Sequence, residues 1–356
     1  MQSVTIGKNQ AGQRLDKFLH KYLPLAGTGF LYKMLRKKNI VLNGKKALGS
    51  EILAPNDRVD SFFSEETFAK FSGRVCSETA PGSSLGAEPP VPRKLKALLQ
   101  EYTAAYAKVQ GIRVLYEDED ILILDKPAGI LTQKAAAEDA SLNEWMIGYL
   151  IERNPDLAGE LETFRPAVCN RLDRNTSGIV LCGKSLAGLQ YLGECIKERR
   201  VRKFYRTICI GRLAAPMTLE GFINKDDKSN IVTVRQASDP SQSKAVPIHT
   251  VCTPLKATDG YTLLEVELIT GKSHQIRAHL ASIGHPLIGD SKYGRENRNR
   301  ALREKYGLDH QLLHAYRVQF PDADSGTGKQ LSGQSVTAPC PKAFRRLQEA
   351  LGLALD

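Results

Sequence analysis

The sequence lacks the long apolar runs that membrane proteins need. No stretch of its 356 residues comes near about eighteen consecutive apolar side chains, the length at which a membrane-spanning helix is suspected. The segment from Met1 to Lys8 also contains no apolar run of signal-peptide length. We therefore expect a cytoplasmic protein without a membrane partner.

Cysteine is too scarce and too irregularly spaced to organise the fold. The chain contains seven cysteines, an odd number, and no pair of them has the Cys-x-x-Cys spacing. This pattern argues against a disulfide framework and against a ribbon-type zinc site. We expect reduced thiols and no structural metal.

Motifs for bound nucleotides and catalytic metals are missing as well. The sequence has no Gly-x-x-x-x-Gly-Lys-Ser/Thr loop, no Gly-x-Gly-x-x-Gly after an expected strand and no His-Glu-x-x-His. His274 and His279 are five residues apart, so a helix would hold them on different faces. These absences disfavour nucleotide hydrolysis, hydride transfer and zinc chemistry, and we expect a reaction with no metal and no organic cofactor.

Positive charge is present and is concentrated at the N-terminal end. The chain carries 50 Lys and Arg against 39 Asp and Glu, and its first sixty residues hold eleven of the basic but four of the acidic side chains. Apolar residues from Leu15 to Leu23 have helical spacing, and Thr28 is a suitable N-cap for a second helix that ends near Leu35. Most of the excess charge thus falls on a segment with its own helical pattern.

A basic hairpin follows these two helices. Residues 40–42 predict a strand, Asn43-Gly44 a tight turn before Lys45 and Lys46, and residues 58–62 a strand that could pair with the first. Two helices and such a hairpin resemble the alpha-L RNA-binding motif, which would make residues 1–63 a small RNA-binding domain. The alternative interpretation is a solvated basic helix face without a ligand.

The rest of the chain divides into a linker and one large domain. Residues 64–110 contain Pro- and Gly-rich stretches between residues 81 and 92 and predict a linker, with a helix over 93–110 that leads into the next domain. From residue 111 to 356 we expect an α+β domain with a mixed, mainly antiparallel sheet and flanking helices, because strands and helices do not alternate regularly. The expected strands are 112–116, 121–125, 177–181, 204–210, 231–234 and 261–269, and the expected helices are 142–152, 186–198, 273–283 and 342–351.

One carboxylate lies between two guanidinium groups in the segment Asn170-Arg171-Leu172-Asp173-Arg174-Asn175-Thr176-Ser177-Gly178. The tripeptide alone is uninformative, because Arg14-Leu15-Asp16 repeats it where we expect an ordinary helix start. The longer string strongly resembles the signature of the RluA-type pseudouridine synthases, and this resemblance places the catalytic aspartate of that family at Asp173.

Further segments resemble the same family in chain order. They are Asp125-Lys126-Pro127-Ala128-Gly129-Ile130, Lys203-Phe204-Tyr205-Arg206-Thr207, residues 268–280, residues 284–290 and Leu313-His314-Ala315. The sequence departs from the family at Asn170, where histidine is most common, at Asn175, where aspartate is frequent, and at Lys272, where arginine is frequent. None of these departures removes a group that the reaction needs, but Asn170 leaves the hydrogen bonding of its loop open.

The resemblance implies isomerisation of uridine to pseudouridine in RNA. This reaction breaks the ribose–nitrogen bond, turns the base and rejoins it through carbon five, with no net oxidation. Asp173 could attack the sugar or the base, or stabilise the separated ribosyl species, and the sequence does not choose between these routes. A glycoside hydrolase would need a second carboxylate, and the motif around Asp173 contains none.

The other candidate residues would hold the flipped nucleotide. Arg171 would fill the gap left by the extruded base, Tyr205 would stack on the uracil, and Arg277 would pair with Asp173 and keep it ionised. Lys126 is a candidate phosphate contact. The plain alternatives are a structural ion pair at Asp173, a strand aromatic at Tyr205, a surface charge at Arg277 and a turn residue at Lys126; His274 receives no chemical role.

The substrate expected from the resemblance is large-subunit ribosomal RNA, because family members with an N-terminal alpha-L module generally act there. Transfer RNA is the alternative substrate. A different class of function, a non-catalytic RNA-binding ribosome-assembly factor, would retain the fold without turnover. We expect a monomer, and the sequence does not identify the modified uridine.

Overall fold

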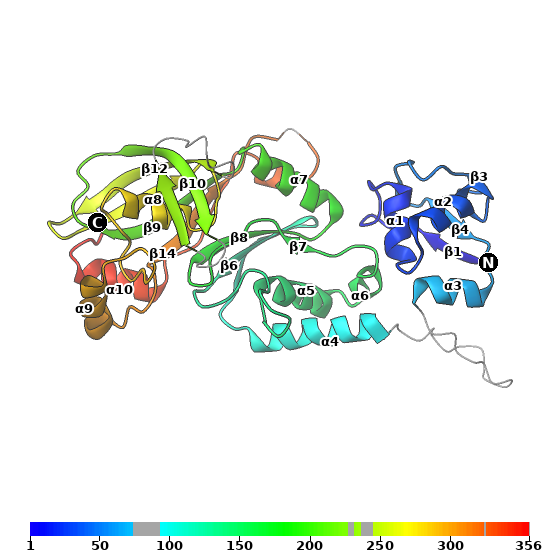
Figure 1. Cartoon of the computed structure of the whole chain (residues 1–356), viewed down its shortest axis with the longest axis horizontal. Coiled ribbons are helices and arrows are strands. Elements are labelled where there is room, and N and C mark those ends of the chain that lie inside the picture. The colour runs from blue at the N-terminus through cyan, green and yellow to red at the C-terminus, as the bar shows by residue number, and fades with distance from the viewer. Residues whose placement is uncertain (74–92, 227–230, 236–244, 324, 356) are drawn as a thin grey trace. The chain divides into compact units, whose positions relative to one another are not determined.

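The computed structural model describes residues 1–73, 93–226, 231–235, 245–323 and 325–355. Residues 1–73 form an N-terminal module with its own hydrophobic core. The four strands form a sheet in the order β1-β4-β2-β3. Figure 1 shows the helices packed together with this sheet. The module contains β1 (Gln2–Thr5), α1 (Leu15–Tyr22), α2 (Thr28–Arg36), β2 (Ile40–Leu42), β3 (Lys45–Lys46), β4 (Arg58–Ser61) and α3 (Glu65–Ser72).

Both helices and the hairpin expected in this segment are present. Asn43 and Gly44 have φ of 51° and 72°, the left-handed values that a two-residue hairpin turn favours, and Arg58–Ser61 pairs with β2 as expected. One detail was wrong: Thr28 is the first residue of α2, and Gly27 is its N-cap. The Thr28 hydroxyl instead lies 3.4 Å from Nε2 of His20.

The boundary expected at residue 63 is too early. Ser64 caps α3 by accepting a hydrogen bond from the backbone N–H of Thr67, and Phe68 and Phe71 pack into the core of the module. The Phe30 and Phe71 rings lie 4.2 Å apart. The expected linker of 64–110 therefore contains α3 and, later, α4 (Arg93–Lys108), while its Pro-rich part between 81 and 92 lies outside the described residues.

The whole chain divides into two compact units, whose arrangement relative to each other is not determined. One contains Met1–Gln110, Asn143–Ala167 and Gly183–Gln190, and the other contains Gly111–Leu142, Val168–Cys182 and Tyr191–Asp356. This division differs from the single domain expected over 111–356, because α5 (Leu142–Arg153) packs against α4. A Cβ at Gly148 would collide with the carbonyl oxygen of Tyr102, so this glycine allows the two helices to approach closely.

A large, mainly antiparallel sheet forms the centre of the second unit, as the α+β expectation required. Its strand order is β11-β10-β12-β13-β9-β14-β8-β6-β5, with β15 paired to β14 and β7 to β8. The pair β14–β8 is parallel, through His314–Ser177 and Ala315–Gly178. The strands are β5 (Arg113–Glu117), β6 (Ile121–Lys126), β7 (Ala167–Val168), β8 (Ser177–Gly183), β9 (Arg202–Ile210), β10 (Met217–Asp226), β11 (Ile231–Arg235), β12 (Val246–Ala257), β13 (Tyr261–Leu268), β14 (Leu313–Gln319) and β15 (Ser335–Thr337).

Helices cover both faces of this sheet. Strand register places Ile208 and Leu263 on one face, where they pack with Phe344 of α10 and Leu302 of α9. Ile248 packs with Ala278 of α8 in a second cluster, on the face to which the register also assigns Tyr205. The remaining helices are α6 (Leu157–Glu160), α7 (Leu186–Lys197), α8 (Gln275–Ser282), α9 (Glu296–Tyr306), α10 (Lys342–Ala350) and the 3₁₀ turn Lys329–Leu331.

No helix in the described part of the chain is long and apolar enough to cross a membrane.

His314, at the parallel strand pair, makes the stability of the fold depend on pH. Its Nε2 lies 3.1 Å from the carbonyl of Ala338 and donates to it, so in the neutral ring Nδ1 accepts from the Ser177 hydroxyl at 2.9 Å. Burial holds the pKa of His314 below 6.5. The unfolded chain then binds more protons, so the free energy of unfolding falls as the pH drops below about 6.5 toward the pKa of the folded state.

We expect the melting temperature to decrease between about pH 7.5 and about pH 5.5. The His314→Gln variant, which cannot titrate, should melt lower at neutral pH but depend less on pH over the same range. Parallel curves for the two proteins would show that His314 does not contribute to the pH dependence.

Candidate active site

The loop between β7 and β8 carries Asp173 and is fixed on both sides of this residue. The Thr132 hydroxyl donates to the carbonyl of Leu172 at 2.8 Å and accepts from the N–H of Leu172 at 3.1 Å. The carbonyl of Arg174 accepts from the N–H of Gly129 at 2.9 Å. Because the backbone is held at Leu172 and at Arg174, the Cα atom of Asp173, from which the side chain extends, has a defined position.

Lys126, the last residue of β6, is not the phosphate contact that the sequence suggested. Its side chain is fully buried, and Nζ donates to the carbonyl oxygens of Pro127, Ile130 and Arg174 at 2.8–3.1 Å. Burial lowers the pKa of Lys126 to about 7, although the carboxylates of Asp173 and Asp125 act in the opposite direction. All three donor positions are used by backbone, so this residue braces the loop behind Asp173 and does not reach RNA.

Asn170 ties the start of the same loop to β8. Its side-chain oxygen accepts from the N–H of Leu181 at 2.7 Å, and its amide nitrogen donates to the carbonyl of Ile179 at 3.3 Å. The hydrogen bonding that the sequence left open is therefore satisfied within the protein. The replacement of histidine by Asn170 leaves the position of the loop defined.

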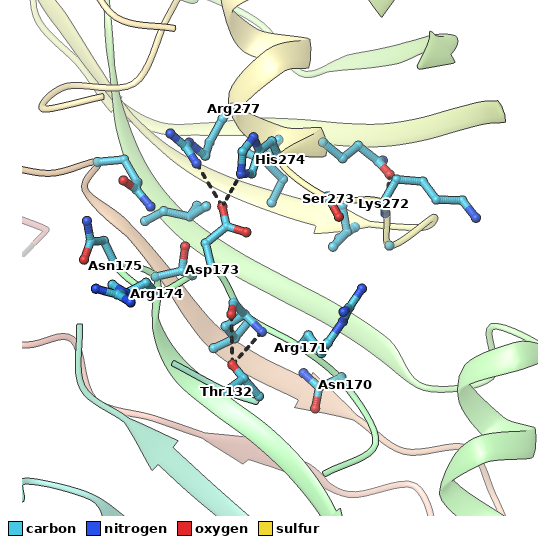
Figure 2. Close-up of a pocket in the computed structure, with 18 of the residues that line it drawn as sticks. Thr132, Asn170, Arg171, Asp173, Arg174, Asn175, Lys272, Ser273, His274 and Arg277 are labelled. Atoms are coloured by element: carbon cyan, nitrogen blue, oxygen red, sulfur yellow. Dashed lines mark hydrogen bonds and ion pairs between the residues drawn. The ribbon is translucent and has the colours of Figure 1, made fainter. Parts of the chain in front are cut away.

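The Asp173 carboxylate is held through one of its two oxygens. Arg277 of α8 donates from Nη1 to Oδ2 at 3.0 Å, and Nε2 of His274 lies 3.9 Å from the same oxygen. Figure 2 shows both interactions converging on this oxygen from one side. Among the described residues no hydrogen bond or ion pair reaches Oδ1, which leaves that oxygen for a substrate atom.

Arg277 owes its position to a second carboxylate, Asp290, whose role was not predicted from the sequence. Asp290 is completely buried and accepts from Nε and Nη2 of Arg277 at 2.7 and 2.9 Å. Burial opposes the charge on Arg277, but Asp290 and Asp173 together raise its pKa above the usual value. Likewise, burial acts to raise the pKa of Asp290, but Arg277 outweighs it and lowers that pKa. The motif of residues 284–290 contained this residue, but nothing in its local pattern indicated the partner.

These residues line a cavity of about 850 Å³ whose walls are strongly cationic. Asp173 is the one acidic residue among the described residues that line it. Figure 2 shows Arg171 and Lys272 extending away from Asp173, so their charges lie at a distance from the carboxylate. Besides Arg277, the basic lining residues are Lys134, Arg171, Arg174, Lys203, Lys272 and Lys292.

Tyr205 of β9 lies in the wall of the same cavity. Only 6% of its surface is exposed, and burial together with the nearby Asp173 carboxylate raises the pKa of its hydroxyl. The ring therefore stays a neutral phenol, which suits stacking on a base. In the structure, Asp173, Arg171, Tyr205 and Arg277 line one cavity. Lys126 is buried and does not line it.

Known proteins are similar to this chain in sequence. Residues 120–282 match the family model described as RNA pseudouridylate synthase. A Vibrio vulnificus protein named ribosomal large subunit pseudouridine synthase C is 29% identical over 90% of this chain and 88% of its own length. A Xanthomonas campestris protein named ribosomal large subunit pseudouridine synthase D is 29% identical over 99% of this chain and 92% of its own.

A solved structure supports the fold. Human RNA pseudouridylate synthase domain containing 4 covers 72% of this chain and 98% of its own, with a TM-score of 0.53 and 21% identity. The matched family segment contains Asp173, Tyr205 and Arg277, which lie together in the cavity described above. Residues 120–282 therefore form an RNA pseudouridylate synthase domain, and the similarity over most of the chain supports a pseudouridine synthase of the RluA type.

Proposed function

We propose that this enzyme converts uridine to pseudouridine in large-subunit ribosomal RNA and that Asp173 is its catalytic residue. The observation that carries the assignment is the Asp173 carboxylate, whose Oδ2 is held by buried Arg277 while Oδ1 is open in a cavity with cationic walls. The substrate class is supported by the names of the Vibrio and Xanthomonas relatives, both ribosomal large-subunit enzymes.

The remaining cavity residues suit a nucleotide that has left its base stack. Extrusion costs a few kcal/mol, which the protein can offset by stacking the flipped base and by binding phosphates. Tyr205 offers an aromatic face, and stacking on such a ring contributes about 1–3 kcal/mol per base. Arg171 is exposed at the rim of the cavity and can enter the vacated position or contact the backbone.

The test is a map of pseudouridines in the RNA of a strain that lacks the gene, compared with its parent. We expect one or a few sites to disappear from large-subunit ribosomal RNA, and to return with the wild-type gene but not with an Asp173→Asn gene. Loss of sites from transfer RNA alone would transfer the assignment to that substrate. An unchanged map in both RNA classes would contradict the proposal.

We further propose that the N-terminal module binds RNA. Its exposed basic side chains lie at the end of α2 and on the hairpin formed by β2 and β3. Within the part of the chain that the structure describes, none of them forms an ion pair, so their charge is available to phosphates. These side chains are Lys33, Arg36, Lys37, Lys38, Lys45 and Lys46.

Removing residues 1–73 should weaken binding to long ribosomal RNA and flatten its salt dependence. Each lost phosphate contact lowers the slope of log affinity against log salt by about one unit, because fewer counterions are released on binding. Turnover of a short RNA at saturating concentration should change little, because the cavity around Asp173 belongs to the other compact unit. The cut follows α3, since a cut at residue 63 would leave part of the module core behind.

A charge-reversed variant controls for the deletion. Lys45→Glu/Lys46→Glu changes two exposed residues beside the turn and should keep the fold. We expect it to reproduce part of the loss in salt slope. Affinities and slopes equal to those of the full chain in both proteins would show that this surface is only solvated.

A further inference from the structure

His274 occupies an unusual position beside the catalytic carboxylate. It precedes α8 with φ of 55° and ψ of 13°, a left-handed conformation that is uncommon outside glycine, although histidine, like Asn and Asp, adopts it more often than most residues do. Its side chain is only 10% exposed, and Nε2 lies 3.9 Å from Oδ2 of Asp173. Strained backbone of this kind persists where the surrounding structure holds it, often at functional sites.

The hydrogen bonds behind His274 determine which ring nitrogen carries the proton. The backbone N–H of Val232, in edge strand β11, donates to the hydroxyl oxygen of Tyr293 at 2.9 Å. Because this oxygen already accepts a hydrogen bond, its own proton can be directed to Nδ1 of His274, which lies 3.0 Å away. A neutral imidazole whose Nδ1 accepts must carry its proton on Nε2, the nitrogen that faces Asp173.

Tyr293 is itself fixed by the turn that holds Arg277. Asp290 Oδ1 accepts from the N–H groups of Lys292 and Tyr293 at 2.9 and 3.1 Å, besides its bond to Arg277. The Tyr293 ring packs edge-on against His274, with centroids 5.8 Å apart. The turn of residues 290–293 therefore supports the side chains of both Arg277 and His274, the two groups that approach Asp173.

From this geometry we infer that His274 is a positioning residue, held by Tyr293 as a neutral Nε2–H donor to Oδ2 of Asp173. The inference rests on the proposed catalytic role of Asp173. At 3.9 Å the pair is longer than a hydrogen bond, as catalytic contacts often are before the substrate is bound. With Arg277 on the same oxygen, the His274 N–H fixes the rotation of the carboxylate and directs Oδ1 at the substrate.

The electrostatics of the pair agree with this assignment. Burial lowers the pKa of His274, and the charges of Arg277 and Lys292 act in the same direction, while Asp173 and Asp290 oppose them. Burial also raises the pKa of Tyr293, so its hydroxyl keeps the proton that it donates. A neutral donor orients the carboxylate without adding a second full positive charge to it.

Two amide substitutions separate a positioning role from a structural one. The amide nitrogen of His274→Gln can take the place of Nε2 and donate to Asp173, whereas the shorter side chain of His274→Asn can reach only toward Tyr293. Asn tolerates the left-handed backbone at this position better than Gln does. Backbone strain alone would therefore make the Gln variant the less active of the two, which is the opposite of what we expect. We expect kcat to stay within about fivefold for Gln and to fall at least about thirtyfold for Asn, with similar KM values for RNA. Equal activities, or a more active Asn variant, would overturn the inference.

A second measurement reads the tautomer without turnover. In full-length protein labelled with ¹⁵N-histidine, the His274 signals, assigned by their loss in His274→Asn, should show Nε2 protonated and Nδ1 unprotonated. Tyr293→Phe removes only the hydroxyl and should produce a mixture of tautomers with kcat lowered about three- to tenfold. An Nδ1–H tautomer in the wild type, or an unchanged tautomer in Tyr293→Phe, would contradict the inference.

These readouts distinguish the two proposals. If Asp173→Asn remained active, the proposed function would fail whatever the tautomer of His274. If Asp173→Asn were inactive but the Gln and Asn variants did not differ, the assignment of His274 alone would fail.

Discussion

The Asp173→Asn enzyme should bind RNA and fold like the wild type but lose turnover by about a thousandfold or more. The amide is nearly isosteric with the carboxylate but supplies no anion to attack the nucleotide or to stabilise a ribosyl cation. The fold should survive because Arg277 keeps its two bonds to the buried Asp290 when the negative charge at residue 173 is removed. RNA affinity should stay equal or rise slightly, because a negative charge leaves a cavity that faces phosphates.

The chain offers a matched control in its other Arg-Leu-Asp tripeptide. Asp16 accepts hydrogen bonds from Arg14 and Tyr32 in the N-terminal module, so Asp16→Asn changes the same residue type in the same local sequence. Turnover of a short RNA, followed as tritium release from uridine labelled at carbon five, should be close to normal for Asp16→Asn. Residual turnover of Asp173→Asn within about tenfold of the wild type would refute the catalytic assignment.

Changing Arg277 should produce the second large effect, and Arg277→Lys is the more informative substitution. Arginine makes two bonds to Asp290 and a third to Asp173 through a planar fork that a single ammonium group cannot reproduce. We therefore expect Arg277→Lys to lose about a hundredfold in turnover while it retains the positive charge. Lys272→Ala, at an exposed residue of the same motif, should lose far less.

Arg277→Ala should be still less active, but it also perturbs the fold. It leaves Asp290 buried without its partner, and an unpaired buried charge costs about 3–5 kcal/mol of stability. The double variant Arg277→Ala/Asp290→Ala removes that charge and should recover part of the melting temperature without recovering turnover. If Arg277→Lys turned over like the wild type, the fork geometry would not matter for catalysis.

The sequence predicts the parts of this site that depend on local pattern and on ordered motifs. Strands such as β6 and β13 have apolar patterns that identify them without tertiary information, and the motif order indicated that Asp173, Tyr205 and Arg277 belong together. The structure places all three at one cavity. The α+β class was predicted correctly for a similar reason, since the irregular order of strands and helices disfavours a doubly wound sheet.

The groups that escaped prediction act through tertiary contacts. A lysine is rarely fully buried, so Lys126 was expected at the surface, and only the fold reveals the three carbonyl groups around it. Asp290 and Tyr293 gain their roles from α8, to which no local pattern connects them. Strands β10 and β12 were missed because Gly221, Pro247 and Pro254 interrupt their patterns, while neighbouring strands supply the pairing that stabilises them.

The parallel pair of β14 with β8 has a consequence for how the protein is made. Strand β14 enters the sheet between β9 and β8, although Ser177 and His314, which meet there, are 137 positions apart in the chain. A Cβ on Gly178 would collide with the carbonyl oxygen of Ala315, so the glycine allows β14 to approach β8 closely. During synthesis from the N-terminus, the edges of β8 and β9 that pair with β14 stay unpaired until residues 313–319 have been translated. Unpaired strand edges favour aggregation. Premature termination before residue 313 would therefore remove more than a terminal segment, because it would leave the central sheet in two separate halves.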